Sequence, residues 1–465
     1  MHPTSLTTLA DVVGGRLADV LDPEAQVTQP AVFDSREVVP GSLFLALRGE
    51  HTDGHAYAEA AVNKGAAVAL VTKPVGVPAI VVDDVLAAMG RLGRFLLHDA
   101  FGTARVVAIT GSAGKTSTKD LIAQVLPGDV VATPQSFNNE IGLPLTITMA
   151  TAGTDYLVLE MGARHIGDIR DLTRIAEPDI SVITNVGTAH VGEFGGRENI
   201  AQAKGEIVEA LQPGGLAVLN ADDDFVRDMG HRTRGRIVTY GLDEQAAIRA
   251  VDITIDGHGC PSYTLTTPEG SARVRLQFVG EVQVHNSLAA AAVAREAGLD
   301  VEQIAAGLSE ALPRSRWRME TTTRADGVTI VNDAYNANPH SMRHSLNALA
   351  SMTRGHDQRS VAVLGRMNEL GQDERTAHEE IGRYAAELGL DQIILVGGEE
   401  AGWMQQGASS TGATAVHLPD QDAALHLLRT TLQPGDVVLI KASRGVQLQQ
   451  LAQALLQLNP SSGDA

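Results

Sequence analysis

The stretch Thr110-Gly111-Ser112-Ala113-Gly114-Lys115-Thr116-Ser117 decides how the rest of the chain is interpreted. A short β-branched run at residues 105–109, typical of a buried strand, precedes it, and residues 119–125 place apolar side chains on one helical face after it. A strand, a glycine-rich turn and a helix start predict a phosphate-binding loop, because helix N-terminal N–H groups point at a bound anion. Lys115 adds positive charge, and the hydroxyl of Thr116 is placed to ligate Mg²⁺.

The match to the general phosphate-loop pattern is incomplete, since Ile109 stands where the first glycine belongs. An ordinary loop is therefore an alternative for this stretch taken alone. The strand before it and the helix after it favour nucleotide binding.

Length and composition restrict the class of protein. A chain of 465 residues predicts about three domains, and 44% hydrophobic with 20% charged residues is typical of soluble globular proteins. The net charge of -20 disfavours binding to nucleic acid and to anionic membranes. The single cysteine, Cys260, excludes an internal disulfide. Without a secretory signal or a long apolar run, we expect a cytoplasmic protein with no membrane insertion.

The first part of the chain alternates short apolar runs with helical patterns. Residues 42–47, 66–71 and 79–82 are predicted strands. The polar segments between them contain Ser35 and Arg36, Gly49 and Glu50, and Asp53 and His55. Such loops are either turns or a site for an anionic ligand, and the residues alone favour turns.

The second part contains near-continuous apolar runs at residues 156–159, 180–184 and 216–219, as expected for strands of a parallel sheet covered on both faces. Polar residues follow each run: Glu160; Asn185 and His190; Asn220, Asp222 and Asp223. Ligands of open α/β sheets bind outside the carboxyl ends of strands. These residues are therefore candidate Mg²⁺ or water ligands, although each one alone is equally compatible with a cap or turn.

Three further features lie in this part. Asn138 and Asn139 suit a polar substrate such as a peptide or sugar, or form simple turn chemistry. Lys204 lies on a predicted helix that begins near Glu198, where a solvated lysine is the usual finding. Alternation across residues 251–279 predicts antiparallel strands added to the sheet, and a helix follows at about 286–297.

The third part again alternates strand and helix after a basic connector at residues 313–318, which is a linker or a set of phosphate clamps. Its predicted strands are residues 328–331, 360–364, 392–396 and 437–440, and polar clusters follow three of them, at 332–339, 365–369 and 441–444. The predicted fold is therefore α/β with three domains.

With these clusters assembled, the sequence resembles the Mur ligase superfamily over nearly its whole length. The resemblance is carried by residues 110–116, 137–146 and 333–342. It implies a UDP-sugar-binding domain at 1–102 and a central P-loop ATPase domain at 103–314 with a parallel sheet and added antiparallel strands. A C-terminal Rossmann-like domain at 315–465 would bind D-Ala-D-Ala and close over ATP. The stretches 137–146 and 333–342 point within the family to the enzymes that add D-Ala-D-Ala to UDP-MurNAc-tripeptide.

The resemblance also implies roles for individual residues. Lys115, Glu160, His190 and Lys204 would be catalytic, and the Mg²⁺ ligands would be Thr116, Glu160, His190 and Lys204, the last as a carbamate. The ATP site would comprise Gly111, Ser112, Ala113, Gly114, Lys115, Thr116, Ser117, Asn286, Arg316, Asp333, Tyr335 and Asn336. The UDP-sugar peptide would contact Ser35, Arg36, Gly49, Glu50, Asp53, His55, Asn138 and Asn139.

Some positions depart from the family pattern. Val282 and Gln283 replace a His-Asn pair before the adenine asparagine, and Arg366 replaces an aspartate. Ala442 and Gln449 stand where glycine and glutamate are common. These departures concern the adenine and dipeptide pockets and remove no residue assigned to phosphate or Mg²⁺.

The implied reaction is ATP-driven amide formation through an acyl phosphate, which fits the lack of a Ser-His-Asp or Cys-His signature. The expected protein is a monomer that acts on small molecules and binds no nucleic acid. Two alternatives remain: a sister ligase that adds glutamate or a diamino acid, and a P-loop switch or partner-binding ATPase. The third peptide residue, L-lysine or meso-diaminopimelate, is left open.

Overall fold

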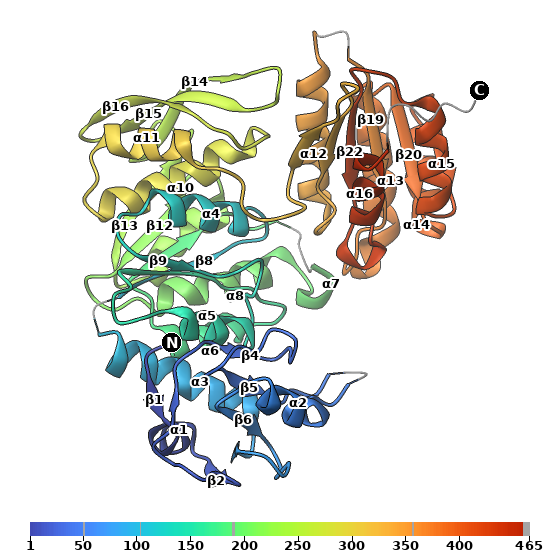
Figure 1. The fold of residues 1–465 in the computed structure, drawn as a ribbon. Coiled ribbons are helices and arrows are strands. Elements are labelled where there is room, and N and C mark those ends of the chain that lie inside the picture. Colours follow the sequence, from blue (N-terminus) through green and yellow to red (C-terminus); the bar gives the residue numbers. More distant parts are fainter. Residues whose placement is uncertain (50–51, 103, 188–190, 356–357, 459–465) are drawn as a thin grey trace.

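Three α/β domains follow one another along the chain in the computed structural model (Figure 1), which describes residues 1–49, 52–102, 104–187, 191–355 and 358–458. The central domain lies between the other two. Within these residues, no helix has the length and apolar character needed to cross a bilayer.

The first domain is built on a five-stranded sheet of order β2-β7-β6-β5-β4, parallel except for the edge pair β2–β7. Its strands are β2 (Arg16–Ala18), β4 (Ala31–Val32), β5 (Leu43–Leu45), β6 (Val68–Val71) and β7 (Ala79–Val81), and β1 (Thr4–Ser5) pairs separately with β3 (Gln26–Val27). The helices are α1 (Leu6–Val13), η1 (Gly54–Tyr57), α2 (Ala58–Asn63), α3 (Val85–Phe95) and η2 (Leu96–Ala100).

The central domain has a nine-stranded sheet of order β16-β15-β14-β13-β12-β11-β8-β10-β9. The strands from β9 to β14 pair in parallel, whereas β14, β15 and β16 pair antiparallel. The bounds are β8 (Arg105–Thr110), β9 (Val130–Ala132), β10 (Tyr156–Glu160), β11 (Ile180–Ile183), β12 (Leu216–Asn220), β13 (Arg236–Gly241), β14 (Ile248–Ile255), β15 (Pro261–Thr267) and β16 (Gly270–Arg275). The central parallel strands β8, β10, β11 and β12 are almost wholly buried because helices cover both faces.

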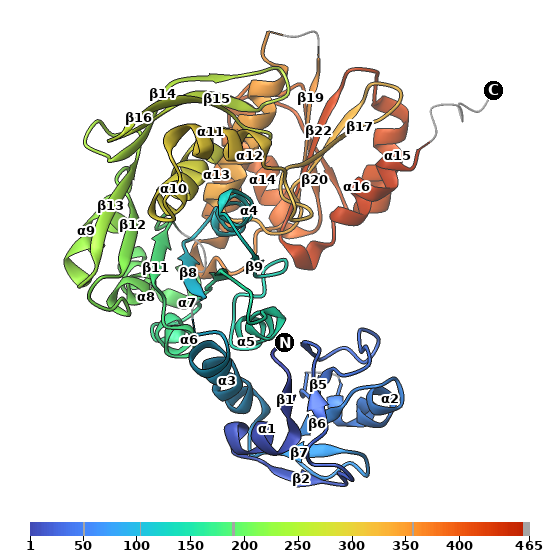
Figure 2. The same cartoon turned by 60° about the vertical axis from the view of Figure 1, so that its left-hand side comes forward.

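The helices of the central domain begin with α4, which follows the phosphate loop directly. They are α4 (Lys115–Val125), α5 (Gly142–Met149), α6 (Asp168–Ala176), α7 (Val191–Phe194), α8 (Arg197–Glu209), α9 (Asp224–Asp228), η3 (Met229–Arg232), α10 (Val282–Glu296) and α11 (Val301–Glu310). The antiparallel strands β14 to β16 lie at the opposite end of this domain from the first domain (Figure 2).

The third domain has a six-stranded sheet of order β17-β18-β22-β19-β20-β21, parallel except for β17–β18. The strands are β17 (Glu320–Thr323), β18 (Thr329–Asn332), β19 (Ser360–Leu364), β20 (Gln392–Val396), β21 (Ala415–Leu418) and β22 (Val437–Lys441). The helices are α12 (Pro339–Thr353), η4 (Gly371–Asp373), α13 (Glu374–Glu387), α14 (Glu399–Ser409), α15 (Gln421–Thr431), η5 (Arg444–Val446) and α16 (Gln449–Leu456).

The first and central domains share one hydrophobic core. Leu92 of α3 belongs to the same buried cluster as Ile147 of α5 and Leu172 of α6. The helices approach closely because Gly93 presents no side chain: a Cβ there would lie 3.2 Å from the side chains of both Ile147 and Ile175. The third domain instead has two clusters, one on each face of its sheet, built almost wholly from its own residues.

The α/β fold, the parallel central sheet and the added antiparallel strands are confirmed. The predicted strands agree with the structure to within a few residues, whereas β1, β2, β3, β4, β9, β13, β17 and β21 were not anticipated. The helix predicted from residue 286 begins four residues earlier, at Val282.

Candidate active site

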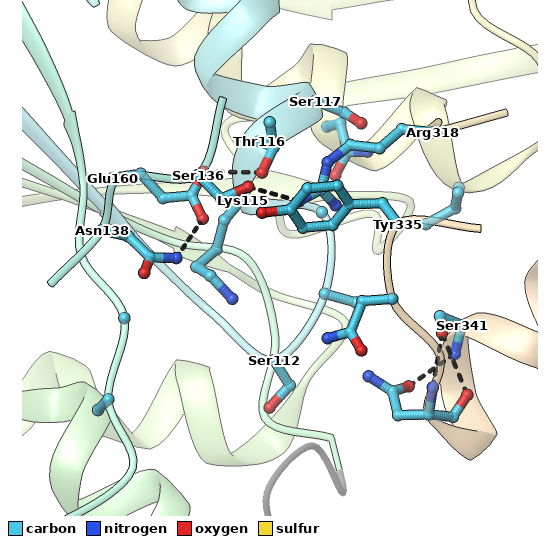
Figure 3. A pocket seen from close by; sticks show the side chains of 18 of the residues that line it. Ser112, Lys115, Thr116, Ser117, Ser136, Asn138, Glu160, Arg318, Tyr335 and Ser341 are labelled. Atoms are coloured by element: carbon cyan, nitrogen blue, oxygen red, sulfur yellow. Dashed lines mark hydrogen bonds between the residues drawn. The ribbon is translucent and has the colours of Figure 1, made fainter. Parts of the chain in front are cut away.

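A cavity of about 770 Å³ lies between the central and third domains. The phosphate loop, the start of α4 and the end of β10 line it from the central domain, and the loop after β18 together with α12 lines it from the third. Figure 3 shows Lys115 and Glu160 on one side of this space and Tyr335 and Ser341 on the other.

The phosphate loop is held in place by the end of the neighbouring strand β11. Asn185 accepts a hydrogen bond from the N–H of Ala113 (3.0 Å) and donates one to its carbonyl (3.1 Å), and Thr184 also donates to that carbonyl (2.6 Å). Gly111 is required here, because a Cβ would lie 1.8 Å from the Thr184 hydroxyl oxygen. At Gly114 (φ +81°) a Cβ would lie 2.5 Å from Asn286 Oδ1, so this position also favours glycine. Asn185 therefore shapes the loop.

Thr116 and Glu160 form the oxygen-rich part of the site. The Thr116 hydroxyl donates to Glu160 Oε2 (2.7 Å), and the Asn138 amide donates to Oε1 (2.8 Å); both contacts are drawn in Figure 3. Hydroxyl and carboxylate oxygens are the donors that Mg²⁺ prefers, and this ion usually takes one or two carboxylates, with substrate phosphates and water completing its shell. The described residues contain no group of three or more His, Cys, Asp or Glu placed for a metal, which is compatible with such a site.

Two lysines converge on the same carboxylate. Lys115 donates to the carbonyl of Gly111 (2.7 Å), and burial lowers the pKa of its amine while Glu160 opposes that shift. Lys204, on α8, is only 3% exposed, so the surface position that the residues alone favoured is wrong. Burial, followed by repulsion from Lys115, places the pKa of Lys204 well below its usual value. Within the described residues its amine has no hydrogen-bond acceptor.

Asn286 connects α10 to the start of α4. Its side-chain oxygen accepts from the Thr118 hydroxyl (3.2 Å), and its amide donates to Gln283 (2.8 Å). Gln283 is one of the departures from the family pattern, and both it and Asn286 line the cavity. The substituted residue therefore orients the asparagine assigned to adenine.

The third-domain loop is fixed from behind by a buried ion pair. Lys441, at the end of β22, contacts Asp333 Oδ2 (2.6 Å) and donates to the carbonyl of Asn336 (3.0 Å). Asp333 also accepts from Ser345 (2.6 Å) and from the N–H of Met319 (3.0 Å). Both Asp333 oxygens are thus used to hold the loop that carries Tyr335 and Asn336 into the cavity.

Arg318, rather than the predicted Arg316, lines the cavity. Its guanidinium lies 4.2 Å from the ring centroid of Tyr335 and donates to the Ser136 hydroxyl of the central domain (2.9 Å). Arg316 is exposed and outside the cavity wall. The two arginines lie two positions apart in an irregular connector, and no periodic pattern in the sequence distinguishes them.

The first-domain residues form a separate group outside the cavity lining. Arg36 makes a bidentate pair with the two oxygens of Asp34 (2.7 and 3.0 Å), which holds the pKa of that carboxyl at about 2. His55 is buried, with Nδ1 2.6 Å from Asp53 and Nε2 accepting from the N–H of Thr72 (3.0 Å). Gly49 donates to the carbonyl of Thr52 (2.8 Å), and Ser35 lies in a turn beside Arg36.

An aromatic contact connects this group to the cavity. The ring of Phe33, 44% exposed, lies 6.3 Å from that of Phe137, which precedes Asn138. Asn139 accepts from the N–H of Gly142 at the start of α5 (3.0 Å). Glu50 and His190 lie outside the described residues.

Several residues that line the cavity were not predicted as site residues from the sequence: Ser136, Gln283, Arg318, His344 and Lys441. Lys441 was within a cluster noted after a strand, and Arg318 was within the basic connector, so a weak signal existed for these two. His344 lies mid-helix and carries no such signal.

Profiles of known families match in three places: the Mur ligase middle domain at residues 109–294, the glutamate ligase domain at 317–444 and the catalytic domain at 32–94. A UDP-N-acetylmuramoyl-tripeptide–D-alanyl-D-alanine ligase of Mycobacterium tuberculosis is 47% identical, with 98% of each chain covered. The Escherichia coli ligase of the same name is 33% identical over 98% of this chain and 99% of its own.

Solved structures agree with the sequence comparisons. MurF from Acinetobacter baumannii superposes with a TM-score of 0.87 at 32% identity, covering 98% of this chain and 99% of its own. MurF ligase from Thermotoga maritima, solved with ADP, gives 0.79 at 30% identity, covering 92% and 97%. Matching profiles, relatives and structures thus extend over all three domains. The chain belongs to the Mur ligase family.

Proposed function

We propose that this chain is an ATP-dependent amide ligase that joins UDP-MurNAc-tripeptide to D-Ala-D-Ala. The observation that carries the proposal is the cavity in which Lys115, Thr116 and Glu160 face Tyr335 and Arg318 of another domain. Full-length relatives named for this reaction support it, and one neighbouring structure contains ADP. The substrate carboxylate would attack the γ-phosphate of ATP, releasing ADP and forming an acyl phosphate.

The residues of the phosphate loop serve the first half of this reaction. N–H groups at the start of α4 and the Lys115 ammonium are positioned to stabilise negative charge on the transferring phosphoryl group. Thr116 and Glu160 would hold Mg²⁺, whose charge would further neutralise the phosphate oxygens. When the nucleotide is bound, Lys115 would exchange the Gly111 carbonyl for a phosphate oxygen.

The second half needs a positioned amine rather than a protein nucleophile. The amino group of D-Ala-D-Ala attacks the carbonyl of the acyl phosphate, and the tetrahedral intermediate collapses to the amide with loss of phosphate. The acceptor would lie on the third-domain side of the cavity, where Asn338 and Ser341 cap α12 with their mutual hydrogen bonds (3.1 and 2.9 Å).

Lys204 is proposed to act as a carbamate. Its lowered pKa favours the neutral amine, the form that adds CO₂, and a carbamate would replace this unpaired buried amine with an anion beside Lys115. Lys204→Ala should lose most turnover and regain part of it with a short carboxylate such as formate. An absence of rescue, in a variant with normal circular dichroism, would argue against the carbamate.

The first domain, residues 1–102, is proposed to receive the UDP-sugar at the loops that carry Arg36 and His55. The contact between Phe33 and Phe137 supports a path from these loops to Asn138 and the cavity. In the same scheme, residues 103–314 bind ATP and residues 315–465 bind D-Ala-D-Ala.

The deciding experiment is phosphate release with ATP, Mg²⁺ and UDP-MurNAc-tripeptide, with and without D-Ala-D-Ala. We expect turnover that requires both substrates and a pentapeptide product by mass. Turnover with glutamate or a diamino acid would move the chain to a sister ligase. ATP hydrolysis indifferent to both substrates would overturn the ligase assignment.

A further inference from the structure

Two histidines lie one turn apart near the N-terminal end of α12. The Nε2 atoms of His340 and His344 are 3.2 Å apart, and the ring centroids are 4.3 Å apart with the planes at 81°. An i, i+4 pair on a helix places both side chains on the same face. The reaction proposed above gives neither histidine a role.

The pair lies where the third domain meets the phosphate loop. His344 lines the cavity. A Cβ built on Gly187, which follows β11, would lie 3.9 Å from the Cβ of His340 and 3.3 Å from the Cβ of Ser112. Asp223 acts electrostatically on His340, and His285 on His344, from the central domain.

The separation of the two nitrogens matches the bite of a transition-metal ion. A tetrahedral ion with bonds of about 2.0–2.1 Å to imidazole holds two nitrogens about 3.3–3.4 Å apart. Imidazole ligands suit Zn²⁺, Ni²⁺ and Cu²⁺, whereas Mg²⁺ prefers oxygen and keeps its waters. This pair would therefore discriminate against the ion expected at Thr116 and Glu160.

We propose that His340 and His344 chelate a divalent transition-metal ion, with Zn²⁺ as the best fit, and that its binding inhibits turnover. No third His, Cys, Asp or Glu among the described residues completes a metal site, so water fills the remaining coordination positions. A hydrated ion at His344 occupies space at the cavity edge, next to the phosphate loop.

The protonation states suit metal binding. Burial lowers the pKa of both imidazoles, that of His344 to about 4, so both rings are neutral at physiological pH. In the hydrogen-bonded pair one Nε2 carries a proton, which must move to Nδ1 of the same ring before the metal binds. Nδ1 of His340 has no partner within the described residues and can accept it. No proton is then released on binding.

The test is a calorimetric titration of Zn²⁺ into the untagged full-length chain in chelator-free buffer. We expect one site of micromolar affinity, and at least a tenfold loss in the double variant His340→Gln/His344→Gln. The control His231→Gln/His426→Gln removes two exposed imidazoles that do not line the cavity and should keep the site. Single His344→Gln removes chelation with a smaller change to α12. Wild-type affinity in the variants lacking His344, or no stoichiometric binding by the wild type, would overturn the proposal.

Inhibition is measured separately, at saturating Mg²⁺, with each protein normalised to its own rate without Zn²⁺. Zn²⁺ should reduce wild-type and control turnover severalfold and leave the normalised rate of the double variant unchanged. Calorimetric binding without inhibition would overturn the inhibitory part. Because calorimetry needs no substrate, failure of the ligase assignment would not be mistaken for failure of this site.

Discussion

The first-domain loops and the central cavity are both polar, but they differ in how their charges are satisfied. Asp34 pairs with Arg36, and both nitrogens of His55 have partners. In the cavity, Lys115 and Lys204 share one carboxylate environment and both have lowered pKa values. The first group is internally balanced, whereas the second is missing negative charge.

The difference indicates which residues a ligand must complete. Unbalanced buried cations are costly unless an anion neutralises them, so the cavity favours phosphate and a carboxylate-like Lys204. The balanced loops present no buried charge that a ligand must neutralise, and Arg36 is largely exposed. We therefore expect substitutions in the cavity to affect turnover strongly and substitutions in the first domain to affect substrate affinity weakly.

The largest effect is expected for Lys115→Met. Removing a cation that stabilises the transferring phosphoryl group should lower kcat by about 10³-fold, or about 4 kcal/mol of transition-state stabilisation. The measurement is the rate of phosphate release with ATP, UDP-MurNAc-tripeptide and D-Ala-D-Ala all present. Arg375→Met, which removes an exposed cation on α13, should stay within about twofold. Equal losses in both variants would mean that net charge, not position, matters.

A smaller effect on activity is expected for Arg318→Ala, and a smaller one still for Arg316→Ala. Arg318→Ala removes the contacts with Tyr335 and Ser136 across the cavity and should lower kcat/KM by about 10²-fold. Arg316→Ala removes an exposed side chain and should change it by less than about threefold. The reverse order in the same steady-state assay would restore the prediction made from the sequence.

Replacing Lys204 or Lys119, two buried lysines of the central domain, should have opposite effects on the stability of the protein. Lys204→Met removes an unpaired amine and should raise the unfolding temperature by about 2–4 °C near pH 7 in CO₂-free buffer. Lys119 instead donates to the carbonyl of Thr133 (2.8 Å) and pairs with Asp120 (2.8 Å), so Lys119→Met should lower it. Differential scanning calorimetry measures both.

The gain in Lys204→Met should depend on pH. The folded-state pKa of Lys204 lies below its unfolded value of 10.5, so the unfolded chain binds more protons between the two values and wild-type stability rises with pH there. The advantage of the variant should therefore shrink from about pH 7 to about pH 9.5. A constant advantage would indicate a packing effect alone.

The smallest effect is expected for Arg36→Ala in the first domain. It should raise KM for the UDP-sugar peptide by about three- to tenfold and leave kcat unchanged, because it removes binding shared by ground and transition states. Asp34→Asn retains the guanidinium but releases its partner and should change KM less. A fall in kcat for Arg36→Ala would place this loop in the chemistry and remove the contrast between the two regions.

The sequence predicts best where local pattern and packing agree. The run before Gly111 is buried on both faces as strand β8. The glycines that follow it and Lys115 occupy the turn that a phosphate-binding loop requires. The short strands β9 and β21 escape prediction because three or four residues carry little periodicity.

The site was predictable where it follows a strand and not where tertiary packing selects a residue. Glu160 follows the predicted strand directly and lines the cavity. Lys204 is buried only because α8 packs against the sheet, which its own helical pattern does not reveal. Arg318 and His344 depend on how the third domain is placed, and this information is not local to either segment.

The core shared by α3, α5 and α6 has a consequence for how such chains can be recombined. The first domain has one cluster of its own around Phe44, but its other cluster continues into the central domain, where Gly93 packs directly on Ile147 and Ile175. A chimera exchanged near residue 102 would join two unmatched halves of one core, whereas an exchange near residue 314 would join domains with largely separate interiors. The C-terminal third of the molecule can therefore be exchanged between related chains as a unit. In the N-terminal two-thirds, the core residues of the two domains must change together.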